Sequence, residues 1–227
     1  QQGYRVEILA ETNWSDGGDK ILIQEGWTLD ALGDKPVGVF LELPSCLYFF
    51  DLYLDSIEMS IKSFRFIEMD PRHLADQYIV GRLPVIVNYE PHVGRAYRKG
   101  GGSIAATSAD FTGSIPEGIW SFEDRLSSIP EDHIVALLLG WLSAVEWMKN
   151  EDNSEAYFRI IDTVLFSDSG AYSADQIREM RDLVRIHDPA ESYSRNKADG
   201  GLYRFLTNLR SFLLTAGLLE RSYDPST

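Results

Sequence analysis

The chain has one cysteine and no long hydrophobic run. Cys46 has no second cysteine among the 227 residues, so a framework of disulfide bonds is excluded. This suits the reducing cytoplasm and also a periplasmic protein that needs no covalent bridge. No stretch of about 18 consecutive apolar residues occurs, so the sequence predicts no helix that spans a membrane.

Basic side chains are scarce as well. The chain carries 21 lysines and arginines against 35 aspartates and glutamates, which gives a formal net charge of −14. Proteins that bind nucleic acid need clustered basic side chains to contact the phosphates. Because the basic run at residues 95–99 is short, the sequence predicts no nucleic-acid partner. Acidic pairs such as Glu151 and Asp152 fit a solvated surface.

Patterns that carry metal or catalytic chemistry are missing too. The four histidines lack the spacing of zinc ligands, both with one another and with Cys46. No nucleophile elbow is present either. We therefore expect no metal site, no cofactor and no catalytic turnover, so that the protein is not an enzyme. The histidines are His73, His92, His133 and His187.

The best-defined part of the chain runs from Gly38 to Pro91. Three short strands rich in valine, isoleucine and phenylalanine alternate there with two helical patterns. Such alternation is typical of an α/β fold with a parallel sheet and right-handed crossover helices. Ligands bind outside the carboxyl ends of such strands. The helix start at Ser45 and residues 88–91 follow two of those ends.

Helices dominate the chain after Pro130. The pattern of residues 131–149 places apolar side chains on most faces, so we expect this helix to be buried on more than one side. Ser173 with Gln176 fits a capping box, and Gly217 fits the residue that follows a helix end. The predicted helices are 131–149, 155–165, 173–186 and 201–214.

These amphipathic helices need an apolar sheet to cover. The strands expected before Gly26, near Val6 and Ile21, are too few to supply one. We therefore expect that further residues precede Gln1 and complete this half of the protein.

Four segments carry a resemblance to a known family. They are residues 13–21 with a Ser-x-Gly-x-Asp turn, residues 29–41, residues 83–91 ending in Tyr-Glu-Pro, and residues 107–116. In this order they resemble the solute-binding proteins of nitrate-, sulfonate- and taurine-type ABC transporters, with the related thiamine-precursor-binding proteins. One departure is Pro84, where the family has a small residue, and proline fits only the start of that strand.

The resemblance implies the type II periplasmic-binding-protein fold, an α/β fold with two lobes and parallel-rich sheets. Lobe one is expected to comprise residues 1–25 and 103–227, and to be incomplete and rich in helix towards its C-terminus. Lobe two is expected to comprise residues 26–102. Residues 21–25 and 103–107 then cross between the lobes and form the hinge.

The function implied by the resemblance is extracytoplasmic binding of a small organic solute for uptake by an ABC transporter. The solute is expected to be anionic or zwitterionic, and sulfonate- or pyrimidine-like. The implied partner is the transporter permease, with the protein periplasmic or extracellular, lipid-anchored or free, and not inserted into the membrane. Two alternatives stay open, because a fold does not fix a function. One is the sensory domain of a receptor with a signalling module, and the other is a biosynthetic enzyme.

The ligand site is expected where three loops converge between the lobes. Trp14 and Tyr89 supply aromatic surface, the helix start at Ser45 supplies N–H donors, and Glu90 supplies a charged acceptor. Simpler interpretations stand beside these: Ser45 caps its helix, Glu90 pairs with a cation, and Trp14 covers the edge of a core. The expected ligand-binding residues are Asn13, Trp14, Ser15, Asp16, Leu43, Pro44, Ser45, Asn88, Tyr89, Glu90, Thr107 and Ser108.

Replacement of Trp14 or Glu90 by alanine is predicted to weaken ligand binding tenfold or more, about 1.4 kcal/mol, because each change removes a direct contact. The thermal midpoint of the ligand-free protein should stay nearly unchanged. Calorimetric titration with an identified ligand measures both affinities, and parental affinity in both variants would contradict the site.

Overall fold

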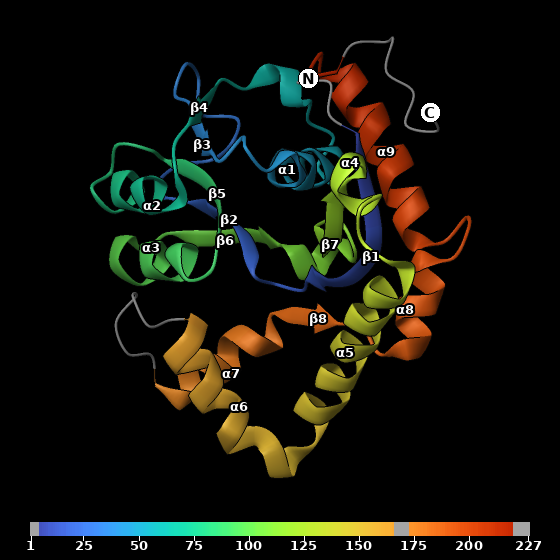
Figure 1. Cartoon of the computed structure of the whole chain (residues 1–227). Helices are drawn as coiled ribbons and strands as arrows, with labels where there is room; N and C mark the ends of the chain where they lie inside the picture. Colours follow the sequence, from blue (N-terminus) through green and yellow to red (C-terminus); the bar gives the residue numbers. More distant parts are fainter. Residues whose placement is uncertain (1–4, 166–172, 220–227) are drawn as a thin grey trace. The chain divides into compact units, whose positions relative to one another are not determined.

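The computed structural model describes residues 5–165 and 173–219 (Figure 1). The chain divides into two compact units. Unit 1 comprises residues 1–14 and 116–203, and unit 2 comprises residues 15–115 and 204–227. Each unit is built from two separate stretches of sequence, so the chain passes between the units at 14/15, 115/116 and 203/204.

Unit 2 is organised around a five-stranded sheet. Its strands are β2 (Asp19–Ile23), β3 (Val37–Val39), β4 (Phe66–Glu68), β5 (Val85–Tyr89) and β6 (Ser103–Thr107). They follow the order β4-β3-β5-β2-β6. β3 is parallel to β4 and β5, whereas β2 is antiparallel to β5 and β6. The predicted α/β class with parallel strands is therefore confirmed.

Helices cover both faces of this sheet, and each face has its own apolar core. The helices are α1 (Pro44–Ser56), α2 (Pro71–Ile79), α3 (His92–Gly100) and α9 (Gly201–Thr215), with the 3-10 turns η1 (Ile61–Ser63) and η2 (Ser108–Phe111). Ile21 and Ile23 of β2 pack in the cluster that includes α1 and α9, whereas Leu22 packs with α2 and α3. Successive side chains of β2 thus point to opposite faces of the sheet, as strand geometry requires.

Unit 1 combines a small sheet with helices (Figure 1). Its elements are β1 (Val6–Ser15), β7 (Pro116–Phe122), α4 (Glu123–Leu126), α5 (Glu131–Lys149), η3 (Glu151–Asn153), α6 (Ser154–Ile160), the π-helical turn η4 (Ile161–Leu165), α7 (Ala174–Asp182), β8 (Val184–Ile186) and α8 (Pro189–Asn196). The sheet has the order β7-β1-β8, and β1 is antiparallel to β7. The last residue of β1, Ser15, belongs to unit 2 by its contacts.

Local signals placed two helix ends correctly. Ser173 and Gln176 form the predicted capping box at the start of α7, with side chain and backbone bonded reciprocally. Gly217 lies just beyond the end of α9 and adopts a φ of 72°. That left-handed conformation costs glycine little, which confirms its predicted place after a helix end.

The helix predicted at residues 173–186 ends early, at Asp182. Val184–Ile186 instead form β8 beside β1, and the backbone N–H of His187 donates to the Thr12 carbonyl. The β-branched residues of this segment suit a strand, but its partner strand is far away in the sequence. Helical spacing alone could not reveal that pairing.

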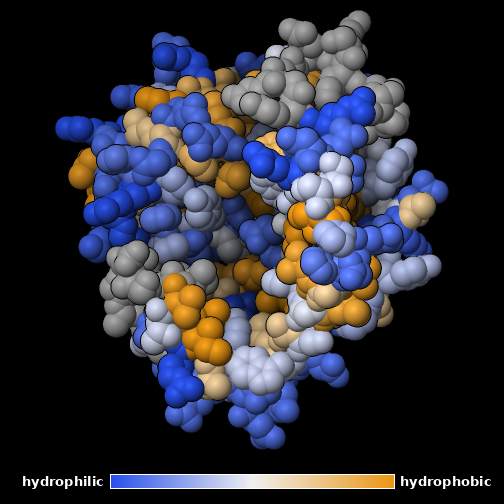
Figure 2. All heavy atoms as spheres, viewed as in Figure 1, coloured by the Kyte–Doolittle hydropathy of each residue, from blue (hydrophilic) through white to orange (hydrophobic). Residues whose placement is uncertain are grey.

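α5 is far more exposed than its apolar sequence predicts. Val145 is buried, but Val135, Leu137 and Leu139 are 47%, 54% and 58% exposed. Figure 2 shows apolar side chains gathered where this helix runs. The expectation of burial on several sides is therefore wrong, because the residues that the structure describes place no second apolar layer against these faces.

β2 and β6 contain the two segments expected to cross between the lobes, residues 21–25 and 103–107. Ile21 pairs with Ala106 inside the unit 2 sheet. The compact units change over at 14/15 and 115/116, and α9 from residue 204 onwards belongs with unit 2, so the division into lobes stays a prediction. Antiparallel pairing between segments distant in the sequence holds these strands together.

Gly38 in β3 is predicted to tolerate no side chain. A Cβ there would lie 2.8 Å from side-chain carbons of both Leu74 and Leu83, closer than carbon atoms pack. Gly38→Ala should therefore lower the free energy of unfolding by about 1–3 kcal/mol in urea denaturation. Gly140→Ala on α5 is the matched control, because nothing lies within 4 Å of a Cβ there and alanine favours a helix by about 1 kcal/mol. Parental stability of Gly38→Ala would refute the packing.

Candidate functional site

One edge of the unit 2 sheet gathers most of the predicted site residues. The parallel strands β3 and β5 end at this edge, and the antiparallel strand β2 begins there. The register places Asp19 opposite Tyr89 and places Lys20 opposite both Asn88 and Thr107. This is the edge at which α/β sheets bind ligands.

Ser15 and Ser108, both predicted, are buried in contact with each other, with 2.8 Å between their Oγ atoms. Ser108 Oγ also accepts the backbone N–H groups of Gly17 at 2.8 Å and Asp19 at 3.3 Å. The Asp19 N–H lies 3.2 Å from Ser15 Oγ as well, so the two hydroxyl oxygens share it, and either hydroxyl can donate to the other. Asp16 is partly buried in the bend that follows Ser15.

Asp19 is a buried acidic residue that the site prediction left out. The Cys46 thiol donates to its Oδ1 at 3.8 Å. Burial, and then the charge of Asp19, holds the pKa of Cys46 far above its usual range. The thiol therefore stays protonated at neutral pH and is a poor nucleophile. The signal was available, since Asp19 is the acidic residue of the Ser-x-Gly-x-Asp turn.

Glu90 forms an ion pair with Lys20. The interpretation that Glu90 pairs with a cation is therefore correct. Lys20 Nζ lies 2.7 Å from Glu90 Oε1, and the two side chains are only 12% and 19% exposed. The backbone N–H of Gly94 donates to Glu90 Oε2 at 3.1 Å. An ammonium group has three donors, so Lys20 keeps donors beyond the one that Glu90 accepts. The pair presents a positive and a negative group side by side.

The Asn88 side chain uses both of its polar atoms in hydrogen bonds within unit 2. Its Nδ2 donates to the Pro71 carbonyl at 2.8 Å, and its Oδ1 accepts the Tyr89 N–H at 2.9 Å, which ties β5 to the start of α2. The Tyr89 ring packs edge-on against His92, with 6.1 Å between centroids. Burial raises the pKa of Tyr89 and lowers the pKa of His92. Both side chains are therefore neutral at neutral pH.

The start of α1 does not carry the simple cap considered for Ser45. Leu43 occupies the N-cap position without a side-chain hydrogen bond, and Pro44 and Ser45 follow in the first turn. Ser45 thus contributes a backbone N–H to the positive end of the helix dipole. Thr107, also predicted, uses its N–H to bond Asp110 Oδ2 at 2.7 Å and so shapes the η2 turn.

Asn13 and Trp14 belong to unit 1, whereas the other ten predicted residues belong to unit 2. Asn13 Nδ2 donates to Glu117 Oε2 at 2.6 Å, and its Oδ1 accepts the Thr12 hydroxyl at 2.7 Å. The Trp14 ring lies against His187, with 4.8 Å between centroids. Convergence of the three loops on one cavity therefore stays a prediction.

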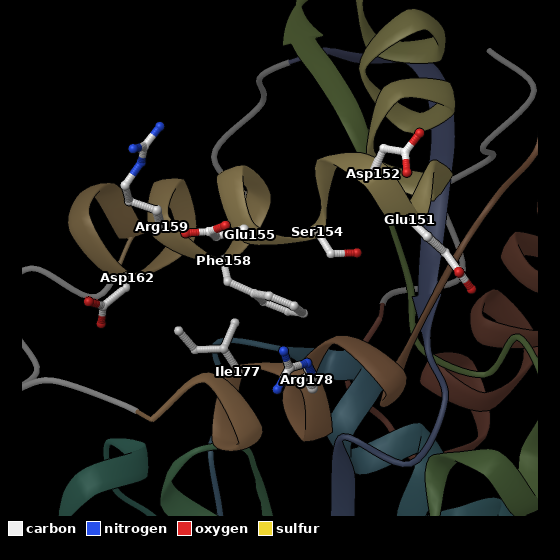
Figure 3. A pocket seen from close by; sticks show the side chains of 9 residues that line it. All are labelled: Glu151, Asp152, Ser154, Glu155, Phe158, Arg159, Asp162, Ile177 and Arg178. Atoms are coloured by element: carbon white, nitrogen blue, oxygen red, sulfur yellow. The ribbon is translucent and has the colours of Figure 1, made fainter.

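Unit 1 contains a hollow of about 630 Å³ that the sequence did not predict (Figure 3). Figure 3 shows Phe158 of α6 and Ile177 of α7 pointing into it from facing helices. The Arg178 guanidinium lies 4.6 Å above the Phe158 ring. The lining residues are Glu151, Asp152, Ser154, Glu155, Phe158, Arg159, Asp162, Ile177 and Arg178. Four carboxylates and two guanidinium groups line it, so its net charge is negative.

A second hollow, of about 450 Å³, lies in unit 2 between α1 and α9. Asp51 and Asp55 of α1 line it together with Tyr48 and Phe212. Burial, and then the charge of Asp55, raises the pKa of Asp51 to about 6. A carboxyl group whose pKa is raised on folding destabilises the folded state once it ionises.

Asp51→Asn is predicted to stabilise the protein at neutral pH. The Asp51 pKa rises from 3.8 in the unfolded chain to about 6 in the folded protein, so stability falls as pH rises through this window. The variant should gain about 1 kcal/mol above pH 7, after allowance for solvent screening, and nothing below pH ~4. Urea denaturation across this range measures the difference, with exposed Asp30→Asn as control. A gain that does not vary with pH would contradict the assignment.

Two negative findings hold for residues 5–165 and 173–219. No group of three or more histidine, cysteine, aspartate or glutamate side chains there could hold a metal ion. No described helix combines the length and the apolar character that crossing a membrane requires.

Comparison by sequence gives no match, either to a protein-family model or to a curated protein. Solved structures do match. One match is the periplasmic aliphatic sulphonate-binding protein SsuA from Escherichia coli. It covers 98% of this chain and 72% of the SsuA chain, at a TM-score of 0.72 and 12% identity. The protein described as the periplasmic sulfonate-binding protein SsuA of a Methylobacillus flagellatus ABC transporter matches 94% of this chain, at a TM-score of 0.62 and 18% identity.

The nitrate-binding protein NrtA from Synechocystis also matches, with 70% of this chain and 45% of its own covered, at a TM-score of 0.55 and 20% identity. This chain spans 62% of the length of the Methylobacillus protein. Identities this low establish the fold alone. They confirm the expected α/β fold of periplasmic binding proteins.

Proposed function

We propose that the protein binds a small organic solute outside the cytoplasm and delivers it to the permease of an ABC transporter. The fold supports this, because periplasmic sulfonate- and nitrate-binding proteins share it. The proposal implies a periplasmic or extracellular location, with the protein free or lipid-anchored. The solute class that we propose is a zwitterion that carries an amine and a sulfonate.

The Lys20–Glu90 pair is the observation that carries this choice. Both groups are largely buried and lie 2.7 Å apart, at the edge of the sheet where α/β folds bind ligands. A zwitterion can match them with opposite charges, the acid group on Lys20 and the amine on Glu90. Charge-assisted hydrogen bonds of this kind are about twice as strong as neutral ones.

Reversible binding without turnover fits the same residues. The Cys46 thiol is buried and held in its protonated form, which suits packing better than nucleophilic attack. Ser15 is bonded to Ser108 rather than to a histidine that could remove its proton. We therefore propose that the solute leaves the protein chemically unchanged.

Three probes test the proposal by calorimetric titration: taurine, ethanesulfonate and nitrate. Taurine should bind most tightly, because it alone carries both charges. Lys20→Met should weaken taurine and ethanesulfonate binding by tenfold or more, about 1.4 kcal/mol, since both probes use the ammonium group. Glu90→Gln should weaken taurine binding and leave ethanesulfonate nearly unchanged, because only taurine has an amine.

Lys62→Met in η1 is the matched control, since Lys62 is an exposed lysine of the same unit. It should bind all three probes like the parent. Absence of heat and of a thermal shift with every probe would refute the proposed function.

A further inference from the structure

The hollow between α1 and α9 is not used by the proposed function, because its lining includes neither Lys20 nor Glu90. Its volume of about 450 Å³ is that of a site for a small organic molecule. The Tyr48 ring lies 5.5 Å from the Phe212 ring, measured between centroids. The apolar residues of the lining are Leu52, Met59, Ile61, Phe212 and Ala216. A ligand can therefore bury apolar surface against this wall.

Two carboxylates from successive turns of α1 line the same hollow. Asp51 and Asp55 are four residues apart, so their Cβ atoms lie about 5–6 Å from each other and one ammonium group can contact both. Neither carboxylate forms an ion pair within the described part of the chain. The lining also contains Lys62 of η1, which is exposed. Two carboxylates against one ammonium group leave the lining with a net negative charge.

The hydroxyl groups that α9 adds to the lining present acceptors. Ser211 Oγ donates to the Thr207 carbonyl at 3.0 Å, and Thr215 Oγ1 donates to the Ser211 carbonyl at 2.9 Å. Both hydroxyl hydrogens are thus used within the helix, while the oxygens keep lone pairs. Ionised carboxylates only accept as well. These polar groups therefore suit a ligand that donates hydrogen bonds, as an ammonium group does.

The carboxylate of Asp51 costs the folded protein stability. Burial, and then the charge of Asp55, raises the pKa of Asp51 to about 6, so its ionised form is disfavoured in the folded state. Groups with such perturbed titration cluster at functional sites, where stability is often given up for binding. A cation held beside Asp51 favours the ionised form and lowers its pKa again. Binding of a cation would therefore remove the cost.

We propose that the hollow between α1 and α9 binds a primary amine with an apolar body, such as an arylalkylamine. The ammonium group pairs with Asp51 and Asp55, and the apolar body lies against Met59 and Phe212. The described residues contain no group of three or more histidine, cysteine, aspartate or glutamate side chains that could hold a metal ion. The zwitterion proposed for the edge of the sheet does not fit here, because the two carboxylates repel its sulfonate. The two sites are therefore independent.

Four probes separate charge from apolar contact in calorimetric titrations at pH ~7.5. Phenethylamine carries both features, 2-phenylethanol has the apolar body without the charge, methylamine has the charge without the body, and taurine adds a sulfonate. We expect saturable binding of phenethylamine, with at least tenfold lower affinity for each of the other three at this site.

Substitutions identify the residues involved. Asp51→Asn and Asp55→Asn each keep the size of the side chain and remove a charge, so each should weaken phenethylamine binding tenfold or more. Lys62→Met should strengthen it, because a competing positive charge is removed. Asp30→Asn is the matched control, an exposed aspartate of the same unit, and should bind like the parent. Lys20→Met, which impairs taurine binding at the other site, should also bind phenethylamine like the parent.

The pH dependence gives a second readout. Asp51 loses its charge as pH falls through its pKa of about 6, whereas the amine stays protonated. Parental affinity should therefore fall about tenfold from pH ~7.5 to pH ~5, and Asp51→Asn should lose most of this dependence. The other titratable groups of the lining are Asp55 and Tyr48 of α1 and Lys62 of η1, and α9 adds uncharged side chains. Burial raises the pKa of Tyr48, so this phenol stays neutral throughout.

Several results would overturn the site. They are no saturable heat with phenethylamine, equal affinity for 2-phenylethanol, unchanged affinity in both aspartate variants, or equal affinity at pH ~5 and pH ~7.5. The titrations of the parent protein are decisive even where a variant fails to fold. Failure of this site leaves taurine binding at Lys20 and Glu90 untouched, and the reverse also holds.

Discussion

The pairing of β2 between β5 and β6 is the interaction on which unit 2 depends. Its backbone bonds both neighbours, while Ile21 and Leu22, both fully buried, enter the two opposite cores. Burial of each such side chain contributes roughly 1.5–3 kcal/mol. A register slip of one residue would exchange the faces and separate Lys20 from Glu90. Core and candidate site are therefore fixed by the same strand.

Unit 1 is built in a different way. Both apolar core clusters consist of unit 2 residues, and in the described part of unit 1 the buried apolar residues are Val145, Phe158 and Ile177. Polar contacts join its elements instead: Glu11 of β1 pairs with Arg195 of α8 at 2.7 Å and lies 2.9 Å from Nε2 of His187, the residue that follows β8. A buried ionic network stabilises little when complete, but loss of one member leaves an uncompensated charge in the interior. Such a network specifies the pairing of its elements more than it adds stability.

Features that depend on near neighbours in the sequence were predictable, and those that depend on distant partners were not. The α/β class, the Ser173 capping box and the glycine after α9 follow from local pattern, and all are confirmed. The ion pair of Lys20 joins residues 70 apart, and the bond from His187 to Glu11 joins residues 176 apart. No spacing rule indicates such pairs. Likewise, the exposure of α5 depends on which residues pack against it, and the sequence of α5 alone does not reveal those residues.

Neither unit is one stretch of sequence, and this affects how the chain can be made and cut. During synthesis the five strands of the unit 2 sheet, which end at Thr107, all precede β7. That sheet can therefore form before β7 and β8, the two partner strands of β1, have been synthesised. Pairing over such separations is slow, because the loop must close before any contact stabilises it. Since the chain crosses between the units three times, a protease cut at one crossing nicks the protein without releasing either unit.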